Sequence, residues 1–270
     1  MNKNVNEILH ESFTAQIVRK IFYDFKDFVE TFGQIGFYFA WVVKLILKLQ
    51  VNIKQTINEC SRFAVDSLPI TLTVVGMVSV IISMQIAPEL VKQGGGAYVG
   101  TLVAIVMIRE LAVIMSGFAI ISMIGSSMAA EIATMRVTDQ ISAIEVLHVD
   151  PLKYLFVPKV LAGTIMMPFV VIIASLFGIV CAGFTAFVCA QVSRLNYVSS
   201  LWHGLYIKDI CVCLLKASVF GMAIALISSA CGYCATGGAK GVGEATTKAV
   251  VWSFVAMVIL DYLFALVFYV

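Results

Sequence analysis

Apolar runs about as long as a bilayer is thick recur five times along the chain and predict five membrane-spanning helices. The runs cover residues 67–88, 101–130, 160–188, 217–239 and 249–270. Each must be helical, because only a helix pairs its own backbone groups inside lipid. The third run lies in an uncharged stretch too short for two spans and a turn. We therefore expect one long tilted or bent helix there, followed by a loop.

The chain before the first run has a different pattern. Within residues 17–30, isoleucine and phenylalanine recur at helical spacing while charged residues take the other faces. This pattern predicts an amphipathic helix lying in the membrane interface. Residues 31–43 are apolar but short, so they form either a re-entrant continuation or a poorly formed extra span. We expect residues 1–60 to form a cytoplasmic and interfacial segment, and residues 61–270 to form the membrane domain.

The connection after the second run also carries a helical pattern. Val137, Ile141 and Ile144 recur at i, i+4 and i+7, and the pattern ends near His148. A short amphipathic helix of this kind either rests on lipid or docks into the groove of a partner protein. Its charges are mixed rather than basic, which favours docking over binding to anionic lipid.

Composition and charge narrow the function classes. Hydrophobic residues make up 61% of the 270 residues and charged residues 13%, about half the charged share of ordinary soluble domains. This excludes a soluble enzyme and a disordered protein, and a net charge of +2 is too small for nucleic-acid binding. Most lysines and arginines fall on the side of the N-terminus if five spans alternate. The N-terminus is therefore expected in the cytoplasm and the C-terminus outside, with Lys92, Arg194, Lys208 and Lys216 also outside.

Motifs for catalysis, metal binding or nucleotide binding are not evident in the sequence. Gly238 and Gly243 match the glycine spacing of a phosphate-binding loop, but Glu244 follows where that loop needs lysine. Cys231 and Cys234 form a C-x-x-C without a second pair at zinc-site spacing. We expect no catalytic residues, no metal and no cofactor, and no ATP hydrolysis by this chain alone.

Ionisable residues inside the predicted spans are the candidate functional site. Arg109 and Glu110 lie about 12–14 Å into the second run at ~1.5 Å per residue, and arginine at that depth costs at least ~2.5–3.5 kcal/mol. Neighbours on a helix do not face each other, so each needs a partner elsewhere, and Asp261 is the expected partner of Arg109. Two interpretations stay open: an ion pair that holds helices together, and a polar lining for an amphipathic substrate.

Several ordered motifs resemble the MlaE/YrbE family of ABC-transporter permeases. They are REL from Arg109, then GSSMAAEIATMRVTDQISAIEVLHVDPLKYLFVPKVLA, and finally GGAKGVGEATTKAVV followed by Asp261-Tyr262. The resemblance covers about residues 60–270. The chain departs from the family pattern at His148, where glycine is usual, and at Glu244, where a basic residue is common.

This resemblance implies a permease subunit that moves phospholipids across or out of a bacterial inner membrane and maintains outer-membrane lipid asymmetry. It implies a homodimer with a shared lipid cavity, a cytoplasmic ATPase subunit and an MCE-domain lipid-binding protein. Arg109 and Glu110 match the family's polar pair, and with Asp261 they would line the cavity. The residues from Glu131 to His148 would form the helix that couples to the ATPase, with Glu131, Arg136, Asp139 and Glu145 as its charged contacts.

Three other functions are weighed against this one. An ion-coupled secondary transporter of an amphipathic substrate would use Glu110 and Asp261 as proton sites and would work without an ATPase. A membrane redox enzyme would depend on Cys231 and Cys234. A purely structural scaffold would tolerate neutralising Arg109 together with its partner.

Overall fold

The computed structural model describes residues 52–269 and, before them, only Gly33, Gly36 and Trp41. The described part is α-helical without any strand, and five of its helices are long and apolar enough to cross a membrane. The prediction of an all-α protein with five spans is confirmed. The amphipathic helix expected within residues 17–30 lies outside the described residues, as does most of the segment 31–43.

Each of the five spanning helices begins before the apolar run that predicted it, and the fourth also ends before its run does, at Tyr233 instead of residue 239. They are α2 (Ile53–Lys92), the compound helix Gly96–Val137, α7 (Pro151–Ala190), α9 (Ile207–Tyr233) and α10 (Gly238–Tyr269). The α2 and α7 helices have 40 residues each. A helix of that length is ~60 Å long, about twice the hydrocarbon thickness of a bilayer. Both helices therefore tilt or reach beyond the lipid, and α7 is the single long helix that the sequence predicted.

The second span is built from several helical pieces. A 3₁₀ turn η1 (Gly96–Tyr98) leads into α3 (Val99–Val106), and α4 (Ala112–Ile120) and α5 (Ser126–Val137) follow. Two π-helical turns, η2 (Met107–Leu111) and η3 (Ile121–Gly125), separate these pieces. A π turn shifts the register of the side chains around the helix and is frequent at functional sites. Arg109 and Glu110 both lie in η2.

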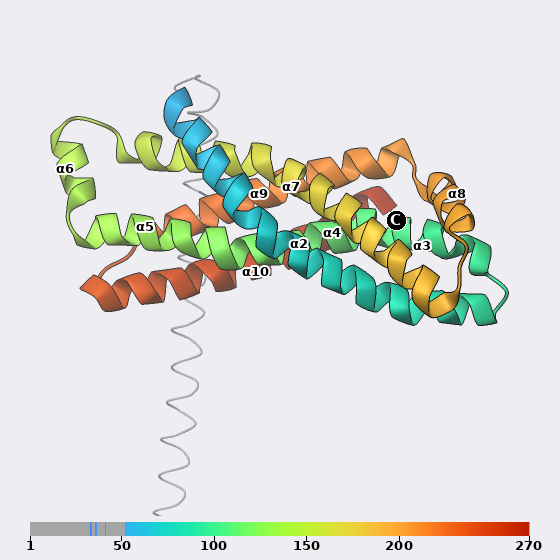
Figure 1. Cartoon of the computed structure of the whole chain (residues 1–270). Helices are drawn as coiled ribbons and strands as arrows, with labels where there is room; N and C mark the ends of the chain where they lie inside the picture. The colour runs from blue at the N-terminus through green and yellow to red at the C-terminus, as the bar shows by residue number, and fades with distance from the viewer. Residues whose placement is uncertain (1–32, 34–35, 37–40, 42–51, 270) are drawn as a thin grey trace, which may run out of the picture.

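Two short helices lie at opposite ends of the bundle (Figure 1), α6 (Gln140–Val146) and α8 (Arg194–Gly204). The single helix expected from Glu131 to His148 is interrupted, because Asp139 takes a left-handed conformation with φ of 57°. Glu131 therefore belongs to the end of the second span rather than to α6. The loop expected after residue 188 begins only after α7 ends at Ala190, and it contains the helix α8.

The helices pack in a connected bundle. The α2 helix runs along α7, α7 runs along α9, and α10 packs against α9 and α5. The backbones of α7 and α9 approach closely at Gly163 and Gly221, where a Cβ on either residue would press into the carbonyl group of the other. Small residues at such crossings let helices pack closely in lipid. The largest side chains of the core include Phe63, Phe156 and Phe220, which are fully buried.

Candidate functional site

A buried lysine in α9 gathers charged groups from three spanning helices. The side chain of Lys216 is 0% exposed, and its Nζ lies 2.7 Å from Glu110 Oε2 and 2.5 Å from Asp261 Oδ1. The same Nζ donates to the carbonyl oxygen of Arg109 at 3.2 Å. Together with Asp209, these residues form what we call the Lys216 cluster. It joins the second span to α9 through charge-assisted hydrogen bonds, which are the stronger class, and α9 to α10 through the ion pair of Lys216 with Asp261.

Arg109 has a different partner from the one predicted. Its Nη2 donates to Asp209 Oδ2 at 3.0 Å, and its guanidinium lies 4.8 Å from the ring centre of Tyr269. The expected pairing of Arg109 with Asp261 is wrong, because Asp261 is held by Lys216. The reason lies in α9, which packs against both the second span and the C-terminal helix and carries an acid for Arg109 and a base for Glu110 and Asp261.

Asp209 and Lys216 are the site residues that the sequence analysis missed. Lys216 borders the apolar run 217–239, so it was expected outside the membrane, whereas α9 begins at Ile207 and carries Lys216 into the bundle. One signal was present in the sequence. The two residues are seven positions apart, two helical turns, and so share one helix face.

One side of the Lys216 cluster is open. The side chains of Arg109 and Glu110 are 32% and 34% exposed, whereas Asp209 is only 5% exposed. The Nε of Arg109 is itself buried and has no hydrogen-bond partner within the described protein, so the exposed part of the guanidinium is its terminal nitrogens. A guanidinium can bind a phosphate or carboxylate with several donors at once, and Glu110 can accept from an ammonium or hydroxyl group. The cluster can therefore meet a charged headgroup at this opening.

A second buried lysine ties a different set of helices. Lys159 of α7 is 3% exposed, and its Nζ lies 2.9 Å from Glu59 and 3.2 Å from Glu131. Arg62 of α2 also reaches Glu131, at 2.6 Å. We call Glu59, Arg62, Glu131 and Lys159 the Lys159 cluster. Of the four residues expected to couple to an ATPase, Glu131 therefore lies in this cluster and joins α5 to α2 and α7.

The other three expected coupling residues surround α6. The guanidinium of Arg136 lies 5.1 Å from the ring centre of Tyr233, and Glu145 accepts a long 3.5 Å hydrogen bond from the hydroxyl group of the same tyrosine. Arg136 and Asp139 also line an open polar pocket of about 330 Å³. These contacts place α6 beside the end of α9.

The surface of α6 combines one buried anchor with exposed apolar residues. Ile141 is fully buried, whereas Val146 and Leu147 are 76% and 74% exposed. Adjacent exposed apolar residues beside charged groups are typical of a surface that another protein covers. Among the residues that the structure describes, no group of three His, Cys, Asp or Glu side chains could hold a metal ion.

Comparison with known proteins agrees with this architecture. The family described as Permease MlaE matches residues 56–267. A probable ABC transporter permease of Synechocystis sp. is 34% identical, over 80% of this chain and 82% of its own length. A probable ABC transporter permease of Rickettsia felis is 32% identical, over 90% of this chain and 93% of its own.

A plant relative is also similar. The protein TRIGALACTOSYLDIACYLGLYCEROL 1, chloroplastic, of Arabidopsis thaliana is 32% identical, over 84% of this chain and 65% of its own length. The region that the family matches contains both lysine clusters described above. The chain therefore belongs to the MlaE permease family of ABC transporters, as a multi-pass membrane protein whose family implies a separate ATPase partner.

Proposed function

We propose that this chain is the membrane-spanning subunit of an ABC transporter that moves phospholipids across or out of a bacterial inner membrane and so maintains outer-membrane lipid asymmetry. The observation that carries the proposal is the open side of the Lys216 cluster. Arg109 and Glu110 are held by partners on α9 yet stay about one third exposed inside an apolar span. A phospholipid supplies both a charged headgroup for this pair and acyl chains for the surrounding apolar helices.

The substrate class has independent support. The Arabidopsis relative is named for trigalactosyldiacylglycerol, a lipid with a polar head and two acyl chains. Acyl chains lose about 0.8 kcal/mol per CH₂ when they leave a membrane, so extraction of a phospholipid needs an energy source. In this proposal ATP hydrolysis occurs in the cytoplasmic ATPase partner, and the chain itself is not an enzyme. An MCE-domain protein receives or delivers the lipid on the other side.

The exposed surface of α10 supports a homodimer. In its most apolar stretch, 11% of the residues are buried within one protomer, against 56% for α9. Asp261 and Tyr269 place this helix beside the Lys216 cluster. A second copy packed near α10 would shelter the open side of the cluster and create a shared cavity, with Arg109, Glu110 and Asp261 at its polar end.

In the proposed complex, α6 docks into the ATPase subunit. Its exposed Val146 and Leu147 supply the apolar contact, with Arg136, Asp139 and Glu145 around it. The excess of basic residues before the first span and around α6 supports a cytoplasmic position for both, and in the proposal the C-terminus lies on the periplasmic side. Movement of α6 would reach the bundle through α5, which Glu131 ties to α2 and α7.

The test is purification of the tagged full-length chain from its native membrane, followed by reconstitution into liposomes that contain a fluorescent phospholipid. The proposal expects an ATPase subunit to co-purify and the lipid to move only when ATP is added. The rival, an ion-coupled secondary transporter, draws support from three carboxylates sharing two cations in the Lys216 cluster. It expects transport by the purified chain alone under a proton gradient, and that result would replace the proposal.

A further inference from the structure

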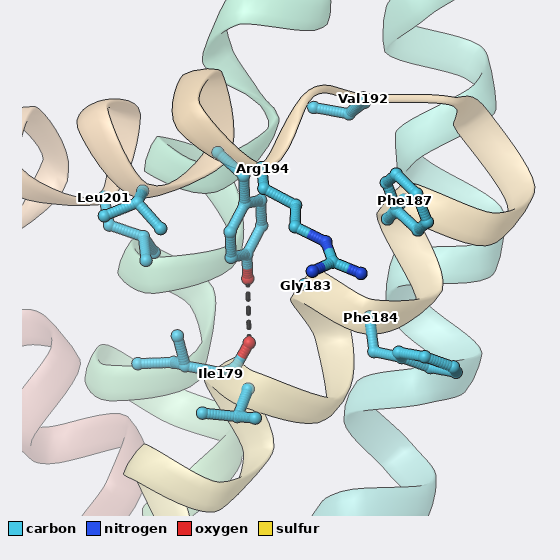
Figure 2. Close-up of a pocket in the computed structure, with 10 residues that line it drawn as sticks. Ile179, Gly183, Phe184, Phe187, Val192, Arg194 and Leu201 are labelled. Atoms are coloured by element: carbon cyan, nitrogen blue, oxygen red, sulfur yellow. Dashed lines mark hydrogen bonds between the residues drawn. The ribbon is translucent and has the colours of Figure 1, made fainter.

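The end of the bundle opposite α6 contains a pocket that the proposed function does not use. It lies between the last turns of α7 and the helix α8, has a volume of about 330 Å³ and is open to the surroundings. Its walls are aliphatic and aromatic, with Phe184 and Phe187 on α7 and Leu201 on α8 (Figure 2). Pockets of this size and character are typical of sites for small apolar ligands.

Two features of the sequence create the pocket. Gly183 lets the ring of Tyr197 lie directly against α7, because a Cβ at that position would press into the ring. The hydroxyl group of Tyr197 donates to the carbonyl oxygen of Ile179 at 2.9 Å (Figure 2), and burial raises the pKa of this hydroxyl group. The only polar atom that the tyrosine brings to the pocket is thereby already satisfied, so the floor stays apolar.

Arg194 is the one charged residue of the lining. Its guanidinium lies 4.8 Å from the ring centre of Phe187 and extends between α7 and α8 (Figure 2). Among the described residues, no carboxylate forms a salt bridge with it, unlike Arg62 and Arg109. Its hydrogen-bond donors are therefore available to an anion, and such a donor fork fits a phosphate in particular.

The position of α8 identifies the surroundings of the pocket as lipid. Leu195, Val198 and Trp202 recur at helical spacing on α8 and are all exposed, while Tyr197 and Ser200 are buried on the other face. A short helix with an outward apolar face lies in the membrane interface, where tryptophan and tyrosine are enriched. Tyr206, also exposed, follows directly after α8.

We propose that the pocket between α7 and α8 binds one acyl chain of an anionic phospholipid, with the lipid phosphate on Arg194. This site is separate from the Lys216 cluster. It requires only that the chain lies in a bilayer, so its test does not depend on whether the chain transports lipid. Charge complementarity and the interfacial position favour a lipid over a partner protein as the occupant.

The probe is a dibrominated phospholipid, whose bromine atoms quench tryptophan fluorescence at short range. The full-length chain carrying Trp41→Phe and Trp252→Phe leaves Trp202, beside the pocket, as the only reporter. It is placed in nanodiscs of phosphatidylcholine with a graded fraction of dibrominated phosphatidylglycerol, and in parallel with dibrominated phosphatidylcholine. Native mass spectrometry then counts the phosphatidylglycerol retained by the same protein.

The proposal expects phosphatidylglycerol to be preferred about three- to tenfold near Trp202, the strength of one charge-assisted contact at an interface. Arg194→Gln should remove the preference and Arg194→Lys should keep part of it. Val180→Phe makes the pocket smaller and leaves the charge of Arg194 unchanged, so it should reduce the number of lipids retained. The matched control is Lys92→Gln, because Lys92 is an exposed cation at the end of α2, outside the pocket lining.

Four results would overturn the proposal. One is an unchanged preference in Arg194→Gln. Another is an equal loss in Lys92→Gln, which would show a general effect of surface charge. The third is unchanged lipid retention in Val180→Phe, and the fourth is a co-purifying polypeptide that shields Trp202 from both brominated lipids. Either of these would show that no acyl chain occupies the pocket.

Discussion

The two buried lysines both neutralise carboxylates inside an apolar bundle, but their clusters differ in net charge. Lys159 and Lys216 each neutralise two carboxylates from other helices. The Lys159 cluster pairs two acids with two bases, whereas the Lys216 cluster gathers three acids around two bases. Two partly exposed charged side chains occur in each cluster, but only the Lys216 cluster lies at a π turn, and its Arg109 also lies over the ring of Tyr269. A balanced cluster joins helices, whereas one with an excess of charge can also hold a ligand.

The largest expected effect follows from removing the cation at the centre of the Lys216 cluster. Lys216→Met leaves Glu110 and Asp261 without their shared partner in an apolar bundle. Breaking a buried ion pair in this way costs about 3–5 kcal/mol, so most of the protein should fail to fold. Thermal unfolding and size-exclusion chromatography of the detergent-solubilised chain measure the loss.

A triple variant separates charge from packing at Lys216. Lys216→Met combined with Glu110→Gln and Asp261→Asn removes the unpaired carboxylates and should recover folded protein without recovering lipid transport. A Lys216→Met protein that unfolds at the wild-type temperature would show that the cluster adds no stability, and the comparison with Lys159 would then fail.

The Lys159 cluster should respond more mildly to the same substitution. In Lys159→Met, Arg62 stays on Glu131 at 2.6 Å, so only Glu59 loses its partner. Leaving one buried acceptor unsatisfied costs about 1–3 kcal/mol, and thermal unfolding should show a smaller decrease than Lys216→Met. Lys153→Met, an exposed position of the same helix, is the control and should change little. Equal losses for Lys159→Met and Lys216→Met would contradict the difference drawn between the clusters.

The spans were predictable because lipid imposes a length and an apolar composition on every crossing. The same rule on composition hid the two buried lysines, because each charged residue at the edge of an apolar run was taken as the border of a span. Lys159 and Lys216 each stand directly before an apolar run that begins at residue 160 or 217, yet each lies well inside a helix. Arg109 and Glu110 were recognised because apolar residues flank them on both sides.

Which charged side chains pair with one another was harder to predict than where those residues lie along the chain. Asp261 was expected to be the partner of Arg109, but the sequence alone could not show that α9 supplies Asp209 to Arg109 and Lys216 to Asp261. Likewise, the apolar spacing of Val137, Ile141 and Ile144 predicted a helix, and only the left-handed Asp139 separates α6 from the end of the second span. Such facts depend on tertiary contacts, which a periodic pattern does not contain.

The two arginines test which cluster meets the lipid. Arg109→Ala should reduce the phospholipid that co-purifies with the complex about tenfold, the effect of about 1.4 kcal/mol, because the exposed guanidinium is lost. Arg62→Ala removes an arginine of the Lys159 cluster that is more exposed than Arg109, at 46% against 32%, and should leave the bound lipid unchanged. Lipid mass spectrometry, normalised to folded protein, gives both values. Equal lipid loss in the two variants would remove the functional role assigned to the Lys216 cluster.

The smallest expected effects distinguish a contact with the ATPase from a tie within the bundle. Glu145 is exposed on α6, whereas Glu131 bonds Arg62 and Lys159. Glu145→Gln should lower the ATPase recovered with the tagged chain about two- to fivefold, equivalent to ~0.4–1 kcal/mol. Glu131→Gln should leave that recovery unchanged. It should reduce the lipid moved per ATP, because Glu131 holds α5 against α2 and α7 and does not contact the ATPase. If Glu131→Gln instead weakens ATPase recovery as much as Glu145→Gln, the Lys159 cluster is part of the docking surface, and the division between a structural cluster and a functional one has to be redrawn.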